Sequence, residues 1–114
     1  MNRDALERYR TRLESLAAEL RRRLEDTEST APISPDRAIG RLTRVEAMQA
    51  QQISLSMRRG REQRLLRVQH ALERVAQGTY GTCTKCGLDI APERLEASPD
   101  TFLCIACAER LRAR

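Results

Sequence analysis

Two pairs of cysteines near the end of the sequence constrain the fold of this chain more than any other feature. Cys83 and Cys86 form one C-x2-C step, and Cys104 and Cys107 form a second. A C-x2-C step lets one tight turn present two thiolates to one ion, and two such steps complete the tetrahedral shell that Zn²⁺ prefers. Gly87, directly after Cys86, allows the backbone to turn back toward the sulfurs. The sequence therefore predicts that these four cysteines bind one structural zinc ion. The alternatives are two disulfides or four unrelated thiols.

The role expected for this metal is in folding, because a closed shell of four cysteines leaves no open coordination position. Residues 78–114 contain too few large apolar side chains to hold so small a module together, and zinc supplies on the order of 10 kcal/mol in such modules. Residues 1–25 are rich in charge and show no hydrophobic signal segment, so we expect a reducing, cytoplasmic location, where disulfides are rare, and no membrane partner.

The first two thirds of the chain are expected to form two long helices. Apolar residues recur at steps of three and four, a seam that needs a partner helix. The members of this seam are Leu6, Tyr9, Leu13, Leu16, Leu20 and Leu24. Pro32 and Pro35 end the first helix. Ser34 is the expected N-cap of a second helix that starts at Pro35 and stops before Gly78.

A tight tip at residues 29–36 sets the expected register of this hairpin. The first helix would cover residues 40–64 of the second and leave residues 65–76 free to pack on the zinc module and on a short C-terminal helix that begins near Cys104. Polar residues and Gly60 interrupt the middle of the second helix, which predicts a looser seam or a bend there.

The predicted fold class is therefore mainly α. An antiparallel helical hairpin (coiled coil) occupies residues 1–77, and a small four-cysteine zinc finger with a short C-terminal helix occupies residues 78–114.

Charge is distributed unevenly along the chain, which carries a net charge of +5. The whole excess lies in residues 41–76, where five arginines cluster: Arg58, Arg59, Arg61, Arg64 and Arg67. A basic helix face can neutralise phosphates, so a nucleic-acid-binding zinc protein is an alternative. We favour a solvated helix whose arginines pair with acids across the hairpin, such as Asp4 and Glu7. Aromatic residues, which stack on bases, make up only 3% of the chain.

The sequence does not indicate an enzyme. The single histidine, His70, lies inside the second helix, and neither a Ser/His/Asp set nor a glycine-rich phosphate loop can be assembled. A thiol redox sensor is a further alternative, because Lys85 beside Cys86 favours the thiolate and zinc release under oxidant.

The zinc segment carries a more specific signature than its cysteines alone. It reads G-x-Y-G-x-C-x-x-C-G from Gly78 to Gly87, and R-L-E-A-x-P-x-x-x-L-C from Arg94 to Cys104. This segment closely resembles the C-terminal zinc finger of the DksA/TraR family, whose members also place a helical hairpin before the finger. The resemblance implies a bacterial regulator that binds RNA polymerase without binding DNA specifically.

The same resemblance implies how such a regulator acts. Family members insert the hairpin tip through the secondary channel of RNA polymerase toward the active site and modulate initiation. Many act together with guanosine tetraphosphate, although no local motif assigns residues to that nucleotide here. We expect a monomer.

The family's tip carries D-x-x-D-x-A, and the aligned stretch here runs from Ile33 to Ala38. Asp36 and Ala38 match the pattern, whereas Ile33 replaces the first acidic residue. The resemblance implies a partner-binding role for Asp36 and Ala38, and the departure at Ile33 bears on the mechanism more than on binding. Asp36 at a helix N-terminus also fits a capping role. Ile33, between two prolines, should be buried by a partner or against the second helix.

Overall fold

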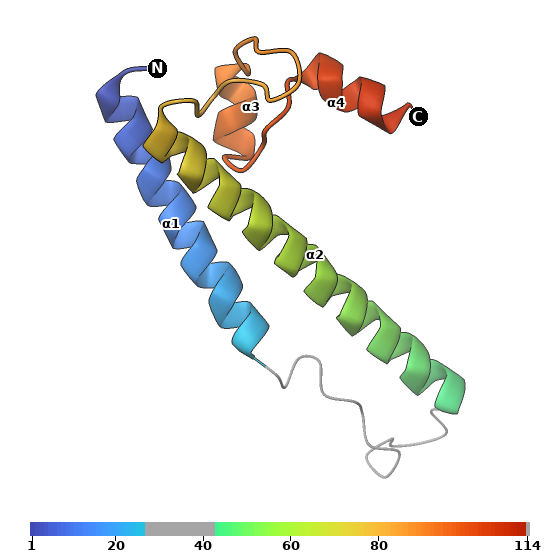
Figure 1. The fold of residues 1–114 in the computed structure, drawn as a ribbon. Coiled ribbons are helices and arrows are strands. Elements are labelled where there is room, and N and C mark those ends of the chain that lie inside the picture. Colours follow the sequence, from blue (N-terminus) through green and yellow to red (C-terminus); the bar gives the residue numbers. More distant parts are fainter. Residues whose placement is uncertain (27–42, 114) are drawn as a thin grey trace.

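The computed structural model describes residues 1–26 and 43–113, and within them four helices form the fold. The helices are α1 (Arg3–Glu25), α2 (Arg44–Gln77), α3 (Pro92–Ala97) and α4 (Ile105–Arg112). Figure 1 shows α1 and α2 as an antiparallel pair, with α3 and α4 at the end of the pair where the chain's N-terminus lies. The predicted mainly α fold, with a helical hairpin followed by a small cysteine-bearing module, is confirmed.

Both long helices have side-chain caps at their start. The Asn2 side chain accepts a hydrogen bond from the Ala5 N–H at 2.8 Å and begins α1. Thr43 has an extended backbone, and its hydroxyl oxygen accepts from the Glu46 N–H at 3.3 Å. Asparagine and threonine are favoured at this position because their side chains satisfy a backbone donor of the first turn.

The start of α2 corrects the sequence-based expectation. We expected one helix to run unbroken from Pro35. This prediction is wrong, because the backbone of Thr43 is extended and α2 begins only after it, at Arg44. Thr43 and Glu46 have the S/T-x-x-E spacing of a capping box, a start signal that competes with Ser34 and Pro35. From there α2 is continuous through Gly60, and Gly78 ends it with a left-handed φ of 78°, as expected.

The two long helices pack along the second half of α2. The buried residues of α1 are Tyr9, Leu13, Ala17 and Leu20, and those of α2 are Val68 and Ala71. Leu65, Leu72 and Val75 pack against this cluster. Arg58 donates a hydrogen bond to the Leu24 carbonyl at 2.8 Å, which places the end of α1 beside Arg58.

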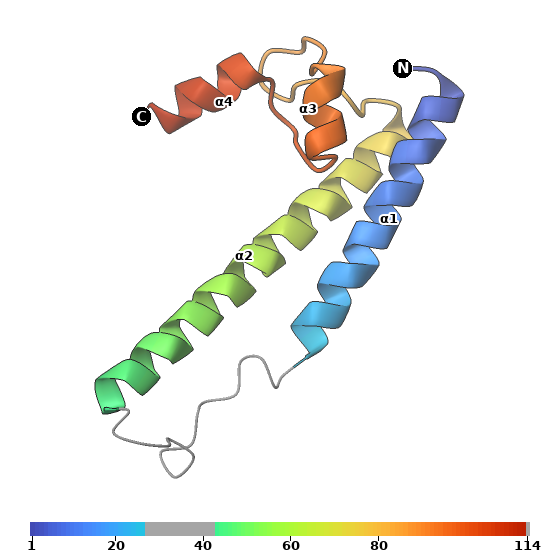
Figure 2. The same cartoon turned by 180° about the vertical axis from the view of Figure 1, so that it is seen from behind.

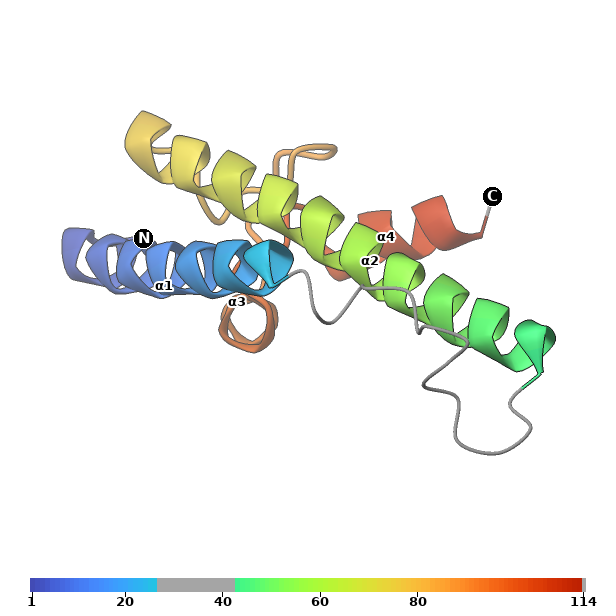
Figure 3. The same ribbon diagram turned by 90° about the horizontal axis from the view of Figure 1, so that it is seen from below.

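The predicted register of the hairpin is therefore wrong. We expected α1 to cover residues 40–64 of its partner, but the end of α1 lies beside Arg58. Among the described residues, α1 therefore packs on the second half of α2 and does not reach along its first half, as Figures 1 and 3 show. The expectation assumed that a tight tip sets the register. The register is instead set at the opposite end of the hairpin, where residues of α1 also contact Glu96 of α3.

The small module and the hairpin share one core. Tyr80, Ile90, Leu95 and Leu103 belong to the same cluster as the buried residues of α1 and α2. The expectation that residues 65–76 pack on the zinc module is thus correct, although α1 packs on them as well. The short C-terminal helix, expected to share this packing, does not lie along α2. In the rear view of Figure 2, α3 lies against the end of the helix pair and α4 projects away from it.

The short helix α3 was not expected from the sequence. Pro92 occupies its first turn together with Glu93, and both residues favour a helix start. At six residues, α3 is too short for helical periodicity to reveal. In the part of the chain that the structure describes, no helix combines the length and the apolar character needed to cross a bilayer.

Candidate metal centre and the contacts that hold it

The four cysteine sulfurs meet in one cluster. All four Sγ atoms lie within 4.8 Å of one another, and the Cys86 and Cys104 sulfurs are 3.7 Å apart. Four Zn–S bonds of about 2.3 Å in a tetrahedron separate neighbouring sulfurs by about 3.8 Å. Each cysteine is a free thiol, so the alternative of two disulfides does not match this arrangement. The set fits a tetrahedral ion.

The chemistry of the donor set also fits a divalent cation. Backbone N–H groups of Cys86 and Cys104 lower the pKa of the Cys83 thiol to about 6. The Cys107 N–H, 3.5 Å from the Cys104 sulfur, lowers the pKa of that thiol in the same way. The Cys107 thiol donates to Cys104 and is buried, which raises its own pKa to about 12. Thiols so close together compete for protons, and a cation allows all four to be thiolates.

A tight turn presents the first cysteine pair. The Gly87 N–H donates to the Cys83 carbonyl at 3.0 Å, and the Cys83 N–H donates to the Leu88 carbonyl at 2.8 Å. Gly87 has a φ of 78°, a conformation that costs little only in glycine. The turn expected at Gly87 is confirmed, and it directs the backbone N–H groups toward the sulfurs.

The second pair belongs to the start of α4, as the sequence analysis expected. Cys104 is the N-cap of this helix, and Cys107 lies in its first turn. The Phe102 carbonyl accepts from the Thr84 N–H at 3.0 Å and from the Thr84 hydroxyl at 3.2 Å. These two bonds tie the second cysteine segment to the first.

The remaining signature residues hold the module together. The Arg94 side chain donates to the Leu103 carbonyl at 2.9 Å, next to Cys104. Leu95 is 2% exposed, at the centre of the core. The Tyr80 hydroxyl donates to the Pro99 carbonyl at 2.8 Å in a buried bond. The two halves of the signature are therefore joined by Tyr80 and Pro99, residues outside the metal cluster.

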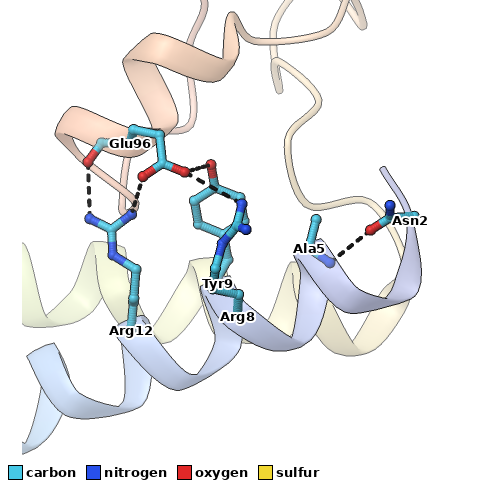
Figure 4. Close-up of polar contacts among 6 residues, drawn as sticks. All are labelled: Asn2, Ala5, Arg8, Tyr9, Arg12 and Glu96. Atoms are coloured by element: carbon cyan, nitrogen blue, oxygen red, sulfur yellow. Dashed lines mark hydrogen bonds and ion pairs between the residues drawn. The ribbon is translucent and has the colours of Figure 1, made fainter.

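Glu96 of α3 fastens the module to α1, as Figure 4 shows. The Tyr9 hydroxyl donates to its carboxylate at 2.7 Å, and Arg12 donates to the carboxylate at 3.2 Å and to the Glu96 carbonyl at 2.9 Å. Arg8 adds an ion pair at 3.6 Å. The Tyr9 hydrogen bond, with the charges of Arg12 and Arg8, lowers the pKa of Glu96. This contact was not expected from the sequence, because a charged residue on a short helix resembles a solvated one.

Asp100 fastens the module to α2. It is 2% exposed, and its carboxylate lies 3.2 Å from Arg67 Nε and 3.6 Å from an Arg64 nitrogen. The Ser98 hydroxyl donates to it at 2.7 Å. Burial raises the pKa of Asp100, but the hydrogen bonds from Ser98, Arg67 and its own N–H, with the charge of Arg64, outweigh burial and bring the pKa below its usual value.

The arginine cluster of α2 is partly neutralised by these pairs. Arg64 and Arg67 face Asp100, and Arg58 pairs with Glu62 at 3.2 Å. The pairing expected across the hairpin is wrong in its partners, because Glu7 pairs within α1 with Arg10. The antiparallel arrangement places the start of α1 beside the C-terminal end of α2, away from the arginine cluster.

Three residues of the expected site lie outside the described part of the chain. These are the tip residues Ile33, Asp36 and Ala38. Of the other candidates, His70 is exposed on α2, and Lys85 is exposed beside Cys86.

Comparison with known proteins gives consistent matches. The family model described as the prokaryotic dksA/traR C4-type zinc finger matches residues 78–113. The RNA polymerase-binding transcription factor DksA of Escherichia coli strain K12 is 34% identical over 110 residues, covering 94% of this chain and 71% of that protein. The similarity therefore extends well beyond the zinc finger.

Solved structures show the same arrangement of elements. The transcription factor DksA2 from Pseudomonas aeruginosa superposes with a TM-score of 0.75 at 26% identity, covering 100% of this chain and 88% of that one. The solution structure of DnaK suppressor protein from Agrobacterium tumefaciens has a TM-score of 0.59 at 35% identity, covering 96% of this chain and 94% of that one.

Proposed function

Because the chain belongs to the DksA/TraR family, we propose that it binds RNA polymerase and regulates transcription without catalysing a reaction. The observation that carries this proposal is the similarity over nearly the whole chain to a protein named for binding RNA polymerase. The hairpin supports it, because α2 alone is 34 residues, or about 51 Å at 1.5 Å per residue. An arm of this length can reach far into a partner.

The zinc finger serves as the base of this arm. We propose that Cys83, Cys86, Cys104 and Cys107 bind one zinc ion, which matches their mutual distances of 4.8 Å or less. Zinc would close the two cysteine turns on each other and stabilise the segment that presents Glu96 and Asp100. These two carboxylates hold the base to α1 and α2, so the ion would set the direction in which the hairpin points.

The finer part of the proposal concerns the tip. The hairpin enters the secondary channel of the polymerase, with Asp36 and Ala38 near the active site, and modulates initiation. Ile33 replaces the first acidic residue of the family's tip pattern. The chain would therefore act with one acidic side chain at the tip, and its effect on promoter complexes would differ from that of relatives with two.

Direct binding to purified RNA polymerase tests the proposal. Zinc-loaded protein should co-purify with the polymerase, and it should change the lifetime of open promoter complexes. Binding to free DNA should be weak and without sequence preference. Tight binding to nucleic acid that falls steeply with salt, with no binding to polymerase, would favour the alternative of a nucleic-acid-binding protein.

We propose two further properties, a monomeric state and a response to guanosine tetraphosphate, each with its own test. Sedimentation of the free protein should give a monomer. The effect on open complexes should be measured with and without guanosine tetraphosphate, since many family members act together with that nucleotide. If the nucleotide changes open-complex lifetime only when this protein is present, the nucleotide acts through the complex of this protein with polymerase.

A further inference from the structure

A small cavity lies beside the cysteine cluster, where Cys86 is exposed. The cavity has a volume of about 200 Å³ and is lined by Lys85, Cys86, Cys107, Arg110 and Leu111. The first two residues belong to the turn of the first cysteine pair, whereas the other three lie on α4. Two of the five, Lys85 and Arg110, carry a positive charge, and we call this pair the cationic edge.

The cationic edge has no carboxylate partner within residues 1–26 and 43–113. Other cations near the zinc finger are paired, since Arg12 contacts a carboxylate of α3 and Arg67 contacts the buried Asp100. The acidic residues that lie near the edge in the sequence, Asp89 and Glu109, do not line the cavity. The thiol groups are therefore the acidic groups that share the cavity with the two cations.

The cysteine cluster has negative charge to offset when it holds zinc. A divalent ion in a shell of four thiolates leaves two negative charges uncompensated. Backbone N–H groups approach the sulfurs of Cys83 and Cys104 and stabilise them as thiolates. Cys83 and Cys107 are buried, whereas Cys86 is exposed. The negative charge is therefore most open to solvent and to neighbouring cations at Cys86, where the cationic edge lies.

We propose that Lys85 and Arg110 increase the affinity of the site for zinc by offsetting the negative charge of the metal–thiolate cluster at Cys86. Neither residue is a ligand, and each acts on the metal through the thiolates, as groups around a metal shell commonly do. This inference rests on the zinc site of the proposed function. It adds one residue from each cysteine segment to the signature of the zinc finger, which leaves position 85 open and ends before α4.

The exposure of the two cations sets the size of the effect. Both side chains reach solvent, which screens their attraction to the cluster. We therefore expect each to change the affinity for zinc by about two- to fivefold, as for an exposed ion pair. Removing both should cost about tenfold, because each cation acts on the cluster separately.

The affinity of the full chain for zinc tests this inference. The test variants are Lys85→Gln, Arg110→Gln and the double variant, and Lys85→Arg restores the charge at position 85. Arg112→Gln is the matched control, since it removes a charge from the same helix outside the cavity. Affinity is measured by competition with a chelator at equilibrium, so that the charge of the chelator affects only the rate of transfer. Circular dichroism at saturating zinc checks the fold.

Each glutamine variant at the cationic edge should bind zinc more weakly, whereas Lys85→Arg and Arg112→Gln should bind it like the wild type. In about 1 M salt, where the Debye length is about 3 Å, the differences should shrink. Stoichiometric zinc in the wild type with equal affinities in the edge variants would overturn the inference and leave the zinc site intact. An equal loss in Arg112→Gln would also overturn it, because net charge would then explain the effect. A wild type that binds no zinc would overturn both proposals.

The charge at position 85 can also be removed from the folded wild type, because Lys85 is the only lysine in the chain. With the N-hydroxysuccinimide ester of acetic acid, the amine attacks the ester carbonyl, an amide bond forms, hydroxysuccinimide leaves and a proton passes to solvent. Lys85→Arg is the control, since a guanidinium is not acetylated and only the terminal amine remains. Treatment of zinc-loaded protein should weaken zinc binding about two- to fivefold in the wild type and leave Lys85→Arg unchanged. An equal response of the two proteins would overturn the inference without recourse to any glutamine variant.

Discussion

At the scale of single residues, Asp100 connects the zinc finger to α2. Its carboxylate is almost completely buried and faces Arg64 and Arg67, whose side chains are each 41% exposed. A buried carboxylate costs desolvation, and here two arginines and a serine hydroxyl compensate for it. Because the arginines reach solvent, breaking these ion pairs costs less stability than breaking a fully buried one.

We predict that Asp100→Asn destabilises the protein by about 1–3 kcal/mol, because two arginines lose their charged partner while the Ser98 hydrogen bond can persist. Urea unfolding of the zinc-loaded protein measures this change. Asp89→Asn is a suitable control, since Asp89 is exposed. A change in stability no larger than that of the control would contradict the assigned role.

The same contact predicts a pH dependence. The pKa of Asp100 in the folded protein lies below its usual value, so its contribution is fully present above the unfolded value of about 4 and is lost as the pH falls through the folded value. The stability difference between wild type and Asp100→Asn should therefore be constant near neutral pH and shrink below about pH 4. Comparing the two proteins cancels the effect of acid on the zinc site, which both share. A difference that grows at low pH would contradict this assignment.

At the scale of elements, α1 is held by a few side chains that point into the shared core. Leu13 is 0% exposed, whereas Leu16, which belongs to the same expected seam, is only partly buried. We predict that Leu13→Ala costs about 2–5 kcal/mol, as for a fully buried leucine, and that Leu16→Ala costs less. Denaturant unfolding of both variants gives the comparison. Equal costs would mean that the two residues are equally buried and that the register of α1 is different.

The zinc finger should depend on its metal. In Cys86→Ser or Cys104→Ser, we predict loss of zinc and unfolding of residues 78–113, because the small module lacks a core of its own. Hydrogen exchange should show the loss there first. Protection in α1 should also fall near Tyr9, since Tyr9 loses its bond to Glu96. Stoichiometric zinc with unchanged protection in either variant would contradict the four-cysteine assignment.

At the scale of the whole molecule, the chain is an elongated arm on a small base, with extents of 58 × 33 × 19 Å. The base is fastened to both helices of the arm, through Glu96 to α1 and through Asp100 to α2. Contacts on both helices restrict rocking of the base against the arm. This arrangement suits a protein whose tip must be held at a set distance from the surface that grips its base.

The tip should act on the partner without being needed for binding. We predict that Asp36→Asn folds normally and binds RNA polymerase with unchanged affinity, but loses most of its effect on open-complex lifetime. The change removes one charge and keeps the shape of the side chain. Ile33→Asp is the companion variant, because it restores the second acidic residue of the family's tip pattern and should strengthen the effect. If Asp36→Asn acts like the wild type at matched polymerase occupancy, Asp36 has no role in the mechanism.

Local patterns in the sequence were sufficient for several features. The two C-x2-C steps predicted the sulfur cluster, Gly78 and Gly87 predicted the helix end and the turn, and the leucine spacing predicted α1. The glycine turns, the helix spacing and each single C-x2-C step depend on residues within a few positions of one another. The meeting of the two steps, 18 positions apart, also needs the hydrogen bonds between Thr84 and Phe102. The proposed zinc ligands and the tip residues Ile33, Asp36 and Ala38 remain predictions.

Only the tertiary structure decided how these elements meet. The seam of α1 fits more than one register on α2, because α2 carries apolar residues in both halves, Val45, Met48 and Ile53 in the first and Leu65, Val68 and Leu72 in the second. The register is selected where Tyr9 and Arg12 meet Glu96, and where Arg67 meets Asp100. These partners lie 33 to 87 positions apart in the chain, and no local pattern distinguishes them from solvated charges. Their positions place the end of α1 beside Arg58, so that α1 packs on the second half of α2 instead of the first.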